Sequence, residues 1–266
     1  MKVFIRYAFL LLALCVTGYG FGPDQARAAD PPDSGDTSIY EVDEDYEALM
    51  EELEEEEGGD AQAVQVADPL YYWNKGVYHF NDKLYFWIMK PVTRGYKAVT
   101  PRFVRTGVSN FFNNLGTPVR FVNNLLQGRS EQAGVELGRF MVNTVAGGLG
   151  FWDVAKYESP LKDPPNKEDL GQTLGVWGVG NGFYIVWPVL GPSTLRDSLG
   201  KVGDSPLYPM FYVDSTGTVI AAEAVDQVND LSFRLGDYES LKESALDPYT
   251  AIRDAYIQYR REQIRK

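Results

Sequence analysis

Few residues in this chain of 266 amino acids are of the types that carry out catalysis. Histidine occurs once, at His79, and cysteine once, at Cys15. A serine hydrolase would have to use His79, but no GxSxG elbow is present, and the nearest sequence, Gly191–Leu195 (GPSTL), does not match it. A zinc site needs several His or Cys ligands, which this composition does not supply. We therefore expect no enzymatic activity, no metal site and no cofactor.

Three carboxylates occupy positions typical of structural roles. Asp247 precedes a proline, which is the pattern of a helix N-cap followed by proline at the first helical position. Asp197 and Asp204 follow the start of another predicted helix. We interpret all three as helix caps or ion-pair partners.

The element that carries His79 is a predicted helix from Asp68 to Pro91. Its main apolar residues recur every three or four positions, which places them on one stripe of a helix. The stripe consists of Leu70, Trp73, Val77, Phe80, Leu84 and Trp87. Further aromatic residues widen it and leave a narrow polar strip of Asn74, Lys75, Asn81, Asp82 and Lys83. Because proline cannot continue the hydrogen-bond ladder, we expect the helix to end at Pro91.

Two interpretations fit so apolar a helix. It is either buried in a large core or lies in a membrane interface, where Trp and Tyr favour the headgroup level and lysines flank the apolar face. The membrane-interface interpretation explains more of the aromatic and lysine pattern. It assigns Trp73, Tyr85, Phe86 and Trp87 to the membrane interface.

Basic residues are concentrated in this part of the chain. Lys75 to Arg120 holds eight basic residues and one acidic residue. This excess suits anionic lipid headgroups but lacks the density of a nucleic-acid surface, so we expect no nucleic-acid partner. A solvated basic face is the alternative.

The rest of the chain favours an all-α fold. Helical spacing recurs in Arg102–Leu115, Val119–Gln127, residues 130–145, Val219–Tyr238 and Asp247–Arg265, and Val92–Pro101 is predicted to be a connector. Gly175, Gly178, Gly180 and Gly182 argue against a regular helix between Gly171 and Gly200. That segment is predicted to be an irregular hairpin of glycine and aromatic residues.

A second glycine group, Gly147, Gly148 and Gly150, follows residues 130–145. It can act as a hinge or allow two helices to approach closely. It is not a nucleotide-binding loop, because no strand precedes it and no GKS or GKT follows.

The N-terminal part is predicted to be an export signal followed by an acidic arm. Residues 1–28 combine a basic start, an apolar core too short to span a bilayer, and the Ala26-Arg27-Ala28 cleavage pattern. The sequence LALC resembles a lipobox that would leave Cys15 lipidated, although Leu14 is not the small residue that motif requires. Residues 29–66 contain a run from Asp33 to Asp60 with 14 acidic and no basic residues, typical of a disordered arm.

Short motifs in residues 68–260 together resemble the MlaA (VacJ) family of outer-membrane phospholipid-transport lipoproteins. They are Asp68-Pro69-Leu70, Trp73-Asn74, His79-Phe80-Asn81, Lys90-Pro91-Val92, Gly107-Val108-Ser109-Asn110-Phe111, Val122 to Gly128, Arg139 to Thr144, Asp169 to Gly182, Leu195-Arg196-Asp197 and Asp247-Pro248-Tyr249. Each motif is weak alone, but their order and spacing are specific. Residues 67–266 are accordingly expected to form one MlaA-like helical domain.

The resemblance implies a ring-like bundle of amphipathic helices on the periplasmic face of the outer membrane, with a polar channel. Such proteins remove misplaced phospholipids from the outer leaflet, pass them to a soluble periplasmic carrier, and associate with trimeric porins. The positions matching Phe80 and Asn81 control opening of the channel, and those matching Gly147, Gly148 and Gly150 precede a mobile hairpin in its wall.

Two other function classes remain possible from the residues alone. A periplasmic scaffold could use the aromatic surface only to dock on a membrane or partner, without moving lipid. A surface-active lipid hydrolase would depend on His79.

Overall fold

The computed structural model describes residues 66–266. The predicted signal sequence, Cys15 and the acidic arm, except for its last residue, lie outside the described residues. Predictions about them stay predictions.

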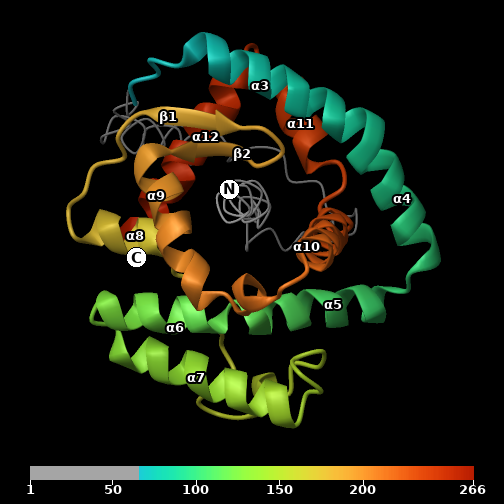
Figure 1. Cartoon of the computed structure of the whole chain (residues 1–266), viewed down its shortest axis with the longest axis vertical. Coiled ribbons are helices and arrows are strands. Elements are labelled where there is room, and N and C mark those ends of the chain that lie inside the picture. The colour runs from blue at the N-terminus through green and yellow to red at the C-terminus, as the bar shows by residue number, and fades with distance from the viewer. Residues whose placement is uncertain (1–65) are drawn as a thin grey trace, which may run out of the picture. The chain divides into compact units, whose positions relative to one another are not determined.

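Helices dominate the described part of the chain, as the sequence predicts (Figure 1). They are α3 (Tyr71–Leu84), the π-helical η1 (Tyr85–Met89), α4 (Lys90–Val99), α5 (Arg102–Leu115), α6 (Thr117–Leu126), α7 (Ser130–Val145), α8 (Leu170–Val176), α9 (Leu195–Asp204), α10 (Thr216–Leu231), α11 (Asp237–Ser244) and α12 (Pro248–Arg265), with short 3-10 turns at Ala155–Tyr157, Ser205–Leu207 and Pro209–Tyr212. Strands β1 (Tyr184–Trp187) and β2 (Gly191–Thr194) form one antiparallel hairpin. The expectation of a mainly helical fold with a hairpin in this segment is confirmed.

The prediction that Pro91 ends the first helix is wrong. α3 continues through η1 into α4, and Pro91 lies in the first turn of α4. The N–H of Lys90 bonds to the carbonyl of Tyr85, five residues earlier. A π-helical turn just before the proline relieves the clash that its ring makes with the carbonyl four residues back in a regular helix. Most of the predicted connector Val92–Pro101 is therefore helix.

Two further boundaries differ from the prediction. Gly171 and Gly175 lie within α8 rather than in irregular structure. These glycines allow close packing of the helix, since an added Cβ would lie 2.7 Å from Asp197 Oδ1 or 2.5 Å from Ile264 Cδ1. The predicted helix Val219–Tyr238 is two helices, α10 and α11. Gly236 separates them with a φ of 114°, a left-handed conformation that glycine adopts without strain.

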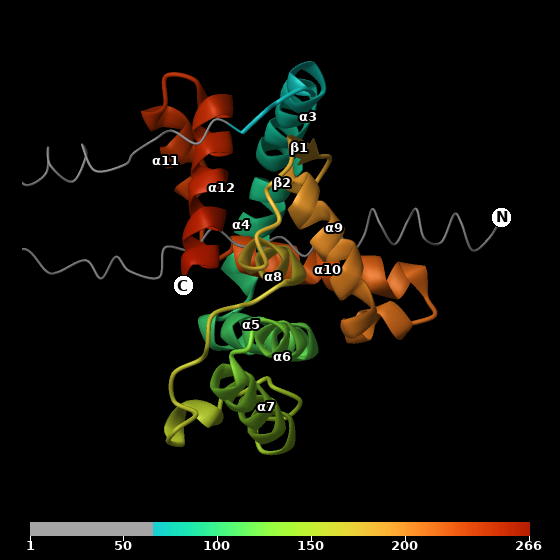
Figure 2. The same cartoon turned by 90° about the vertical axis from the view of Figure 1, so that its left-hand side faces the viewer.

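Contacts between the elements close a circuit within residues 66–266. α3 and α4 form an arc that leads to α5 and α6; α6 contacts α8, α8 contacts α9 and α12, and both of these contact β2. The hairpin then packs against α3, which completes the circuit. Figure 1 shows α10 on the side of α4 that faces the centre of this circuit, and Figure 2 shows α11 and α12 on the opposite side of the α3–α4 arc from α9 and α10.

The distribution of side chains is the reverse of that in an ordinary soluble domain. Among the described residues, buried polar side chains outnumber buried apolar ones, while many large apolar side chains, such as those of Val99 and Val145, are exposed. No helix in residues 66–266 is both long and apolar enough to cross a bilayer.

Candidate functional site

Asn74 joins three parts of the chain at one buried point. Its Nδ2 donates to the carbonyl of Tyr184 at 3.1 Å and to Asp68 Oδ1 at 2.7 Å, and its Oδ1 accepts from the N–H of Val186 at 2.7 Å. Asp68 also accepts a hydrogen bond from the Tyr249 hydroxyl. The start of the folded region, the hairpin and α12 therefore meet at this asparagine, which is fully buried.

Asn81 holds the hairpin in the same way near its turn. Its Nδ2 donates to the carbonyl of Trp187 at 2.9 Å, and its Oδ1 accepts from the N–H of Val189 at 2.7 Å. Val189 has a φ of 70°, an uncommon conformation for a β-branched residue. The Asn81 side chain fixes the backbone at this strained position.

The spacing of the two asparagines matches the spacing along β1. Seven residues of helix advance about 10.5 Å, and three residues of strand advance about 10 Å. Each asparagine binds the carbonyl of one strand residue and the N–H of the residue two positions later, as a neighbouring parallel strand would. α3 thus takes the place of a third strand. The sequence contained a signal for this arrangement, since Asn74 and Asn81 both lie on the predicted polar strip.

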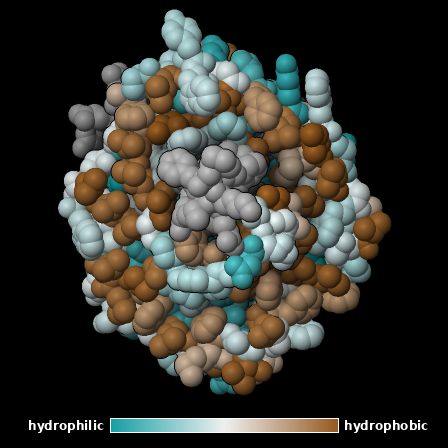
Figure 3. All heavy atoms as spheres, viewed as in Figure 1, coloured by the Kyte–Doolittle hydropathy of each residue, from teal (hydrophilic) through white to brown (hydrophobic). Residues whose placement is uncertain are grey.

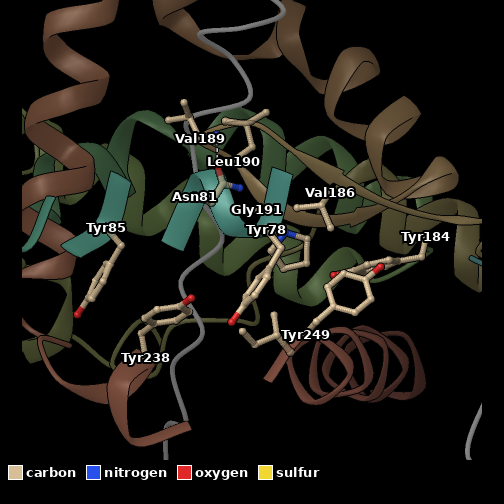
Figure 4. Close-up of a pocket in the computed structure, with 12 residues that line it drawn as sticks. Tyr78, Asn81, Tyr85, Tyr184, Val186, Val189, Leu190, Gly191, Tyr238 and Tyr249 are labelled. Atoms are coloured by element: carbon tan, nitrogen blue, oxygen red, sulfur yellow. Dashed lines mark hydrogen bonds between the residues drawn. The ribbon is translucent and has the colours of Figure 1, made fainter. Parts of the chain in front are cut away.

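A cavity of about 200 Å³ lies between α3, the hairpin, α11 and α12. Five tyrosine rings surround it, and Asn81 lies beside the hairpin turn (Figure 4). The Tyr85 hydroxyl donates to Glu239 at 2.7 Å, and the Tyr238 hydroxyl donates to Asp82 at 2.8 Å. Burial, followed by these carboxylates, raises the pKa of both hydroxyls, so both tyrosines stay neutral donors.

The four predicted membrane-interface residues divide into two pairs. Trp73 and Trp87 point outward, with exposed fractions of 54% and 74%. Tyr85 and Phe86 are half-buried against Tyr238 of α11, with ring centroids 4.8 Å and 6.2 Å from it.

Phe80 and His79 also lie on the outward face of α3. Phe80 is exposed although its neighbour Asn81 binds the hairpin. His79 is exposed beside Tyr78, and no serine within residues 66–266 forms a hydrogen bond with it; Ser193 pairs with Ser198 instead. The described residues also contain no cluster of three acidic, His or Cys side chains able to hold a metal ion.

The glycine group after α7 forms a tight turn. An added Cβ at Gly147 would lie 2.1 Å from the carbonyl oxygen of Trp152, and one at Gly150 would lie 2.4 Å from Asn114 Cβ. Gly148 and Gly150 have positive φ values of 60° and 92°. Close packing within the turn at Gly147, packing against α5 at Gly150, and positive φ values therefore account for the glycines, and the turn's hydrogen bonds in the described part do not reach α3 or the hairpin.

A buried ionic network joins α8, α9 and α12. Arg260 binds Asp169 at 2.7 Å and Asp197 at 3.0 Å, and Asp197 also accepts from Arg196 and from the Tyr256 hydroxyl. Burial, the largest single effect, would raise the pKa of Asp197, but the charges and hydrogen bonds of Arg260, Arg196 and Tyr256 together outweigh it and hold the pKa at about 2. Asp197 is therefore the ion-pair partner that the sequence predicts.

The other two predicted structural carboxylates also bind backbone or side-chain donors. Asp247 caps α12 through the N–H of Tyr249. Asp204 accepts hydrogen bonds from Asn123 Nδ2 at 2.8 Å and from the N–H of Leu170 at 2.9 Å. The second bond gives a partner to a backbone N–H in the first turn of α8, which has none within the helix. Burial raises the pKa of Asp204 to about 7.

The burial of one further carboxyl group was not indicated by the sequence. Glu223 on α10 is 3% exposed, and neither of its carboxylate oxygens has a hydrogen-bond partner in residues 66–266. Burial, and then the nearby Asp226, raises its pKa to about 8. At neutral pH it is largely an uncharged acid facing the interior.

The outer surface is extensively apolar. Figure 3 shows hydrophobic residues across the visible face and along the outer edge. A monomeric soluble protein rarely exposes so much apolar surface, which usually marks contact with a membrane or a partner. With polar groups inside and apolar groups outside, the arrangement is suited to binding lipid.

The MlaA lipoprotein family model matches residues 66–263. The chain belongs to the MlaA lipoprotein family. It is 35% identical to the intermembrane phospholipid transport system lipoprotein MlaA of Shigella flexneri and to that of Escherichia coli K12, over 72% of this chain and 76% of each relative. The corresponding lipoprotein of Haemophilus influenzae is 33% identical, over 74% and 79% of the two chains.

A solved structure reported under the description "Structural basis for maintenance of bacterial outer membrane lipid asymmetry" has the same fold. It superposes with a TM-score of 0.66 at 33% identity, and covers 74% of this chain and 99% of that chain.

The MlaA-family motifs supply many of the buried polar junctions. Besides Asn74 and Asn81, Arg139 and Asn143 both bind Asp153, at 2.8 Å and 2.9 Å, which ties α7 to the segment that follows it. The motifs therefore hold the hairpin on α3 and the segment after α7 in place.

Proposed function

We propose that this chain is an outer-membrane component of intermembrane phospholipid transport that maintains lipid asymmetry. It removes phospholipids that have reached the outer leaflet and passes them to a soluble periplasmic carrier. The family membership and the relatives named for phospholipid transport support this function. The observation that carries it is the reversed distribution of side chains, apolar outside and polar inside.

This distribution suits lipid movement for a physical reason. Moving a zwitterionic or charged headgroup through an apolar layer is costly because its hydration is lost. Polar groups lining a path between the helices lower that cost, while the acyl chains stay in contact with lipid. The step forms and breaks no covalent bond, so it needs no catalytic residue.

Several residues have proposed roles in this process. Trp73 anchors α3 and Trp87 anchors η1 in the membrane interface, with Tyr85 and Phe86 beside them against α11. Asn81, with Phe80 next to it, controls the hairpin, because it binds the hairpin backbone at the turn. The turn of Gly147, Gly148 and Gly150 allows the adjacent segment to move.

The setting of the protein is also a proposal. Export by the N-terminal signal would place it on the periplasmic face of the outer membrane, where lipidation of Cys15 would add an anchor to the amphipathic helices. A soluble lipid carrier and trimeric porins are the proposed protein partners.

The decisive test measures phospholipid in the outer leaflet of cells that lack this protein. We expect surface phospholipid and detergent sensitivity to rise, and re-expression of the wild-type chain to reverse both. An unchanged surface would contradict the proposal and favour the scaffold function. Extraction separates the two independently, because a docked scaffold should be released by salt, whereas a membrane-embedded ring should require detergent.

A further inference from the structure

A groove with a volume of about 740 Å³ lies between the start of α5 and the segment that follows the α7 glycine turn. The residues that define its chemistry are Arg102, Phe103, Thr106, Trp152, Lys156 and Tyr157. None of them belongs to the junction between α3 and the hairpin. The groove is thus a separate feature of the molecule.

The charges in this groove are unbalanced. Arg102 and Lys156 are exposed, and neither forms an ion pair within residues 66–266. The lining carboxylate, Asp153, is held by Arg139 through two hydrogen bonds of 2.9 Å and 2.8 Å. Two cations therefore remain available, and their natural ligand is an anion.

The rim of the groove is aromatic and faces outward. Phe103, Trp152 and Tyr157 have exposed fractions of 71%, 63% and 76%. Lys156 Nζ lies 4.9 Å from the centre of the Tyr157 ring, so a cation and an aromatic surface are adjacent. Exposed aromatic rings next to basic groups are typical of the level where lipid headgroups meet acyl chains.

These two properties together select one class of ligand. A small soluble anion would use the cations but not the rings, and an apolar ligand would use the rings but not the cations. Two cations are too few for a nucleic acid. An anionic phospholipid offers, next to hydrocarbon, a phosphate whose charge no headgroup cation balances, and it matches both.

We propose that this groove binds the headgroup of an anionic phospholipid. Arg102 and Lys156 bind the phosphate, and Phe103, Trp152 and Tyr157 contact the glycerol and the upper acyl chains. The site goes beyond the proposed transport function and does not depend on it, since a protein that only docks on a membrane would use it equally.

The test is vesicle flotation with the full chain, diluted from mild detergent onto phosphatidylcholine vesicles with or without phosphatidylglycerol. The apolar surface should bind both, and phosphatidylglycerol should strengthen binding. In the double variant Arg102→Glu and Lys156→Glu, we expect the affinity for the anionic vesicles to fall by at least roughly thirtyfold, about fivefold for each cation removed, because the two new carboxylates add repulsion. Binding to pure phosphatidylcholine should not change.

The matched control reverses the same charges elsewhere. Arg261→Glu and Lys266→Glu alter exposed residues near the end of the chain and should keep the preference for phosphatidylglycerol. An equal loss in this control would overturn the proposal, because the attraction would then come from the overall charge. A loss on pure phosphatidylcholine vesicles as large as on anionic ones would also overturn it.

A third variant tests the groove without changing any charge. Thr106→Trp should fill the groove from an exposed position and weaken the phosphatidylglycerol preference while both cations remain. If neither this variant nor the charge reversal alters the preference, the groove does not bind the headgroup, and a protein partner becomes the better occupant. Flotation involves no transport, so a failure of headgroup binding in this assay is separate from a failure of the cell assay for lipid asymmetry.

Discussion

Glu223 faces the interior from α10 with both carboxylate oxygens unpartnered in the described part of the chain. Its pKa is about 8 in the folded protein, because of burial and then Asp226, against an ordinary value of 4.5. Between these two pH values the folded state binds more protons than the unfolded state. The contribution of Glu223 to stability is therefore most favourable below about pH 4.5 and declines as the pH rises to about 8.

Glu223→Gln should remove this decline. Above pH 8 we expect the variant to be more stable than the wild type by roughly 1–3 kcal/mol, since it no longer places a charge without partners in the interior. Below about pH 4.5 the two proteins should be equally stable. Denaturant unfolding at a series of pH values measures this difference, with Glu131→Gln, an exposed site on α7, as the control. A difference that does not change with pH would contradict the prediction.

The burial of such residues was not predictable from local sequence. Val219, Glu223 and Asp226 recur at helical spacing, which predicts the helix but not the neighbours of each face. α4 and α5 pack against α10 from more than a hundred positions earlier in the chain. Polar residues at buried positions also reverse the usual rule that relates hydrophobicity to burial.

At the scale of elements, α3 shows what the periodicity of apolar residues can predict and what it cannot. It correctly predicts a helix around Trp73 and Phe80, but not that the polar strip faces the hairpin. That orientation depends on backbone groups of β1 that lie over a hundred residues away. The error at Pro91 has a local cause, because a π-helical turn leaves no simple sequence pattern.

Deleting Phe80 and Asn81 should disturb α3 more than removing only their two side chains would. Each residue turns an α-helix by about 100°, so the deletion rotates everything after it by about 200° relative to Asn74 and brings Lys83 to the Asn81 position. We expect the hairpin to lose its second attachment, the arc to α4 to be displaced, and cells to become sensitive to detergent.

The double substitution Phe80→Ala and Asn81→Ala is the matched comparison, because it removes the same side chains and keeps the helical phase. Asn74 should then still hold β1, and detergent sensitivity should rise less. Equal sensitivity in both strains would show that helical phase is not the cause.

Gly147→Ala tests whether the turn after α7 requires glycine for packing or for motion. The added Cβ would lie 2.1 Å from a backbone oxygen of Trp152, so we expect a destabilisation of about 1–3 kcal/mol by denaturant unfolding. Gly76→Ala is the control in α3, where an added Cβ meets nothing within 4 Å, and should stabilise by about 0.5–1 kcal/mol. Unchanged stability in Gly147→Ala together with impaired lipid asymmetry would instead favour a hinge.

At the scale of the whole molecule, the fold depends on junctions between distant segments. The sequence predicts the all-α class, the bounds of α5 and the start of α12 at Pro248, because periodicity and capping are local. It does not predict how the helices close a circuit. The Tyr249 hydroxyl donates one hydrogen bond to Asp68, and Arg260 donates two to Asp169, and neither contact leaves a local sequence pattern.

The Arg260 network offers the sharpest test of this closure. Arg260→Met would leave Asp169 buried without its cation and Asp197 with Arg196 alone, and breaking a buried ion pair in this way typically costs about 3–5 kcal/mol. Asp197 has a pKa of about 2 in the folded protein and an ordinary value of 3.8, so the stability it contributes is complete above about pH 4 and is lost as the pH falls to about 2. The difference in stability between wild type and variant should therefore be largest near neutral pH and smallest near pH 2.

Denaturant unfolding between pH 7 and pH 2 measures this difference. Arg261→Met, at the exposed neighbouring position, should have little effect at any pH. A penalty that stays constant from pH 7 to pH 2 would mean that Arg260 stabilises the circuit by packing rather than by charge.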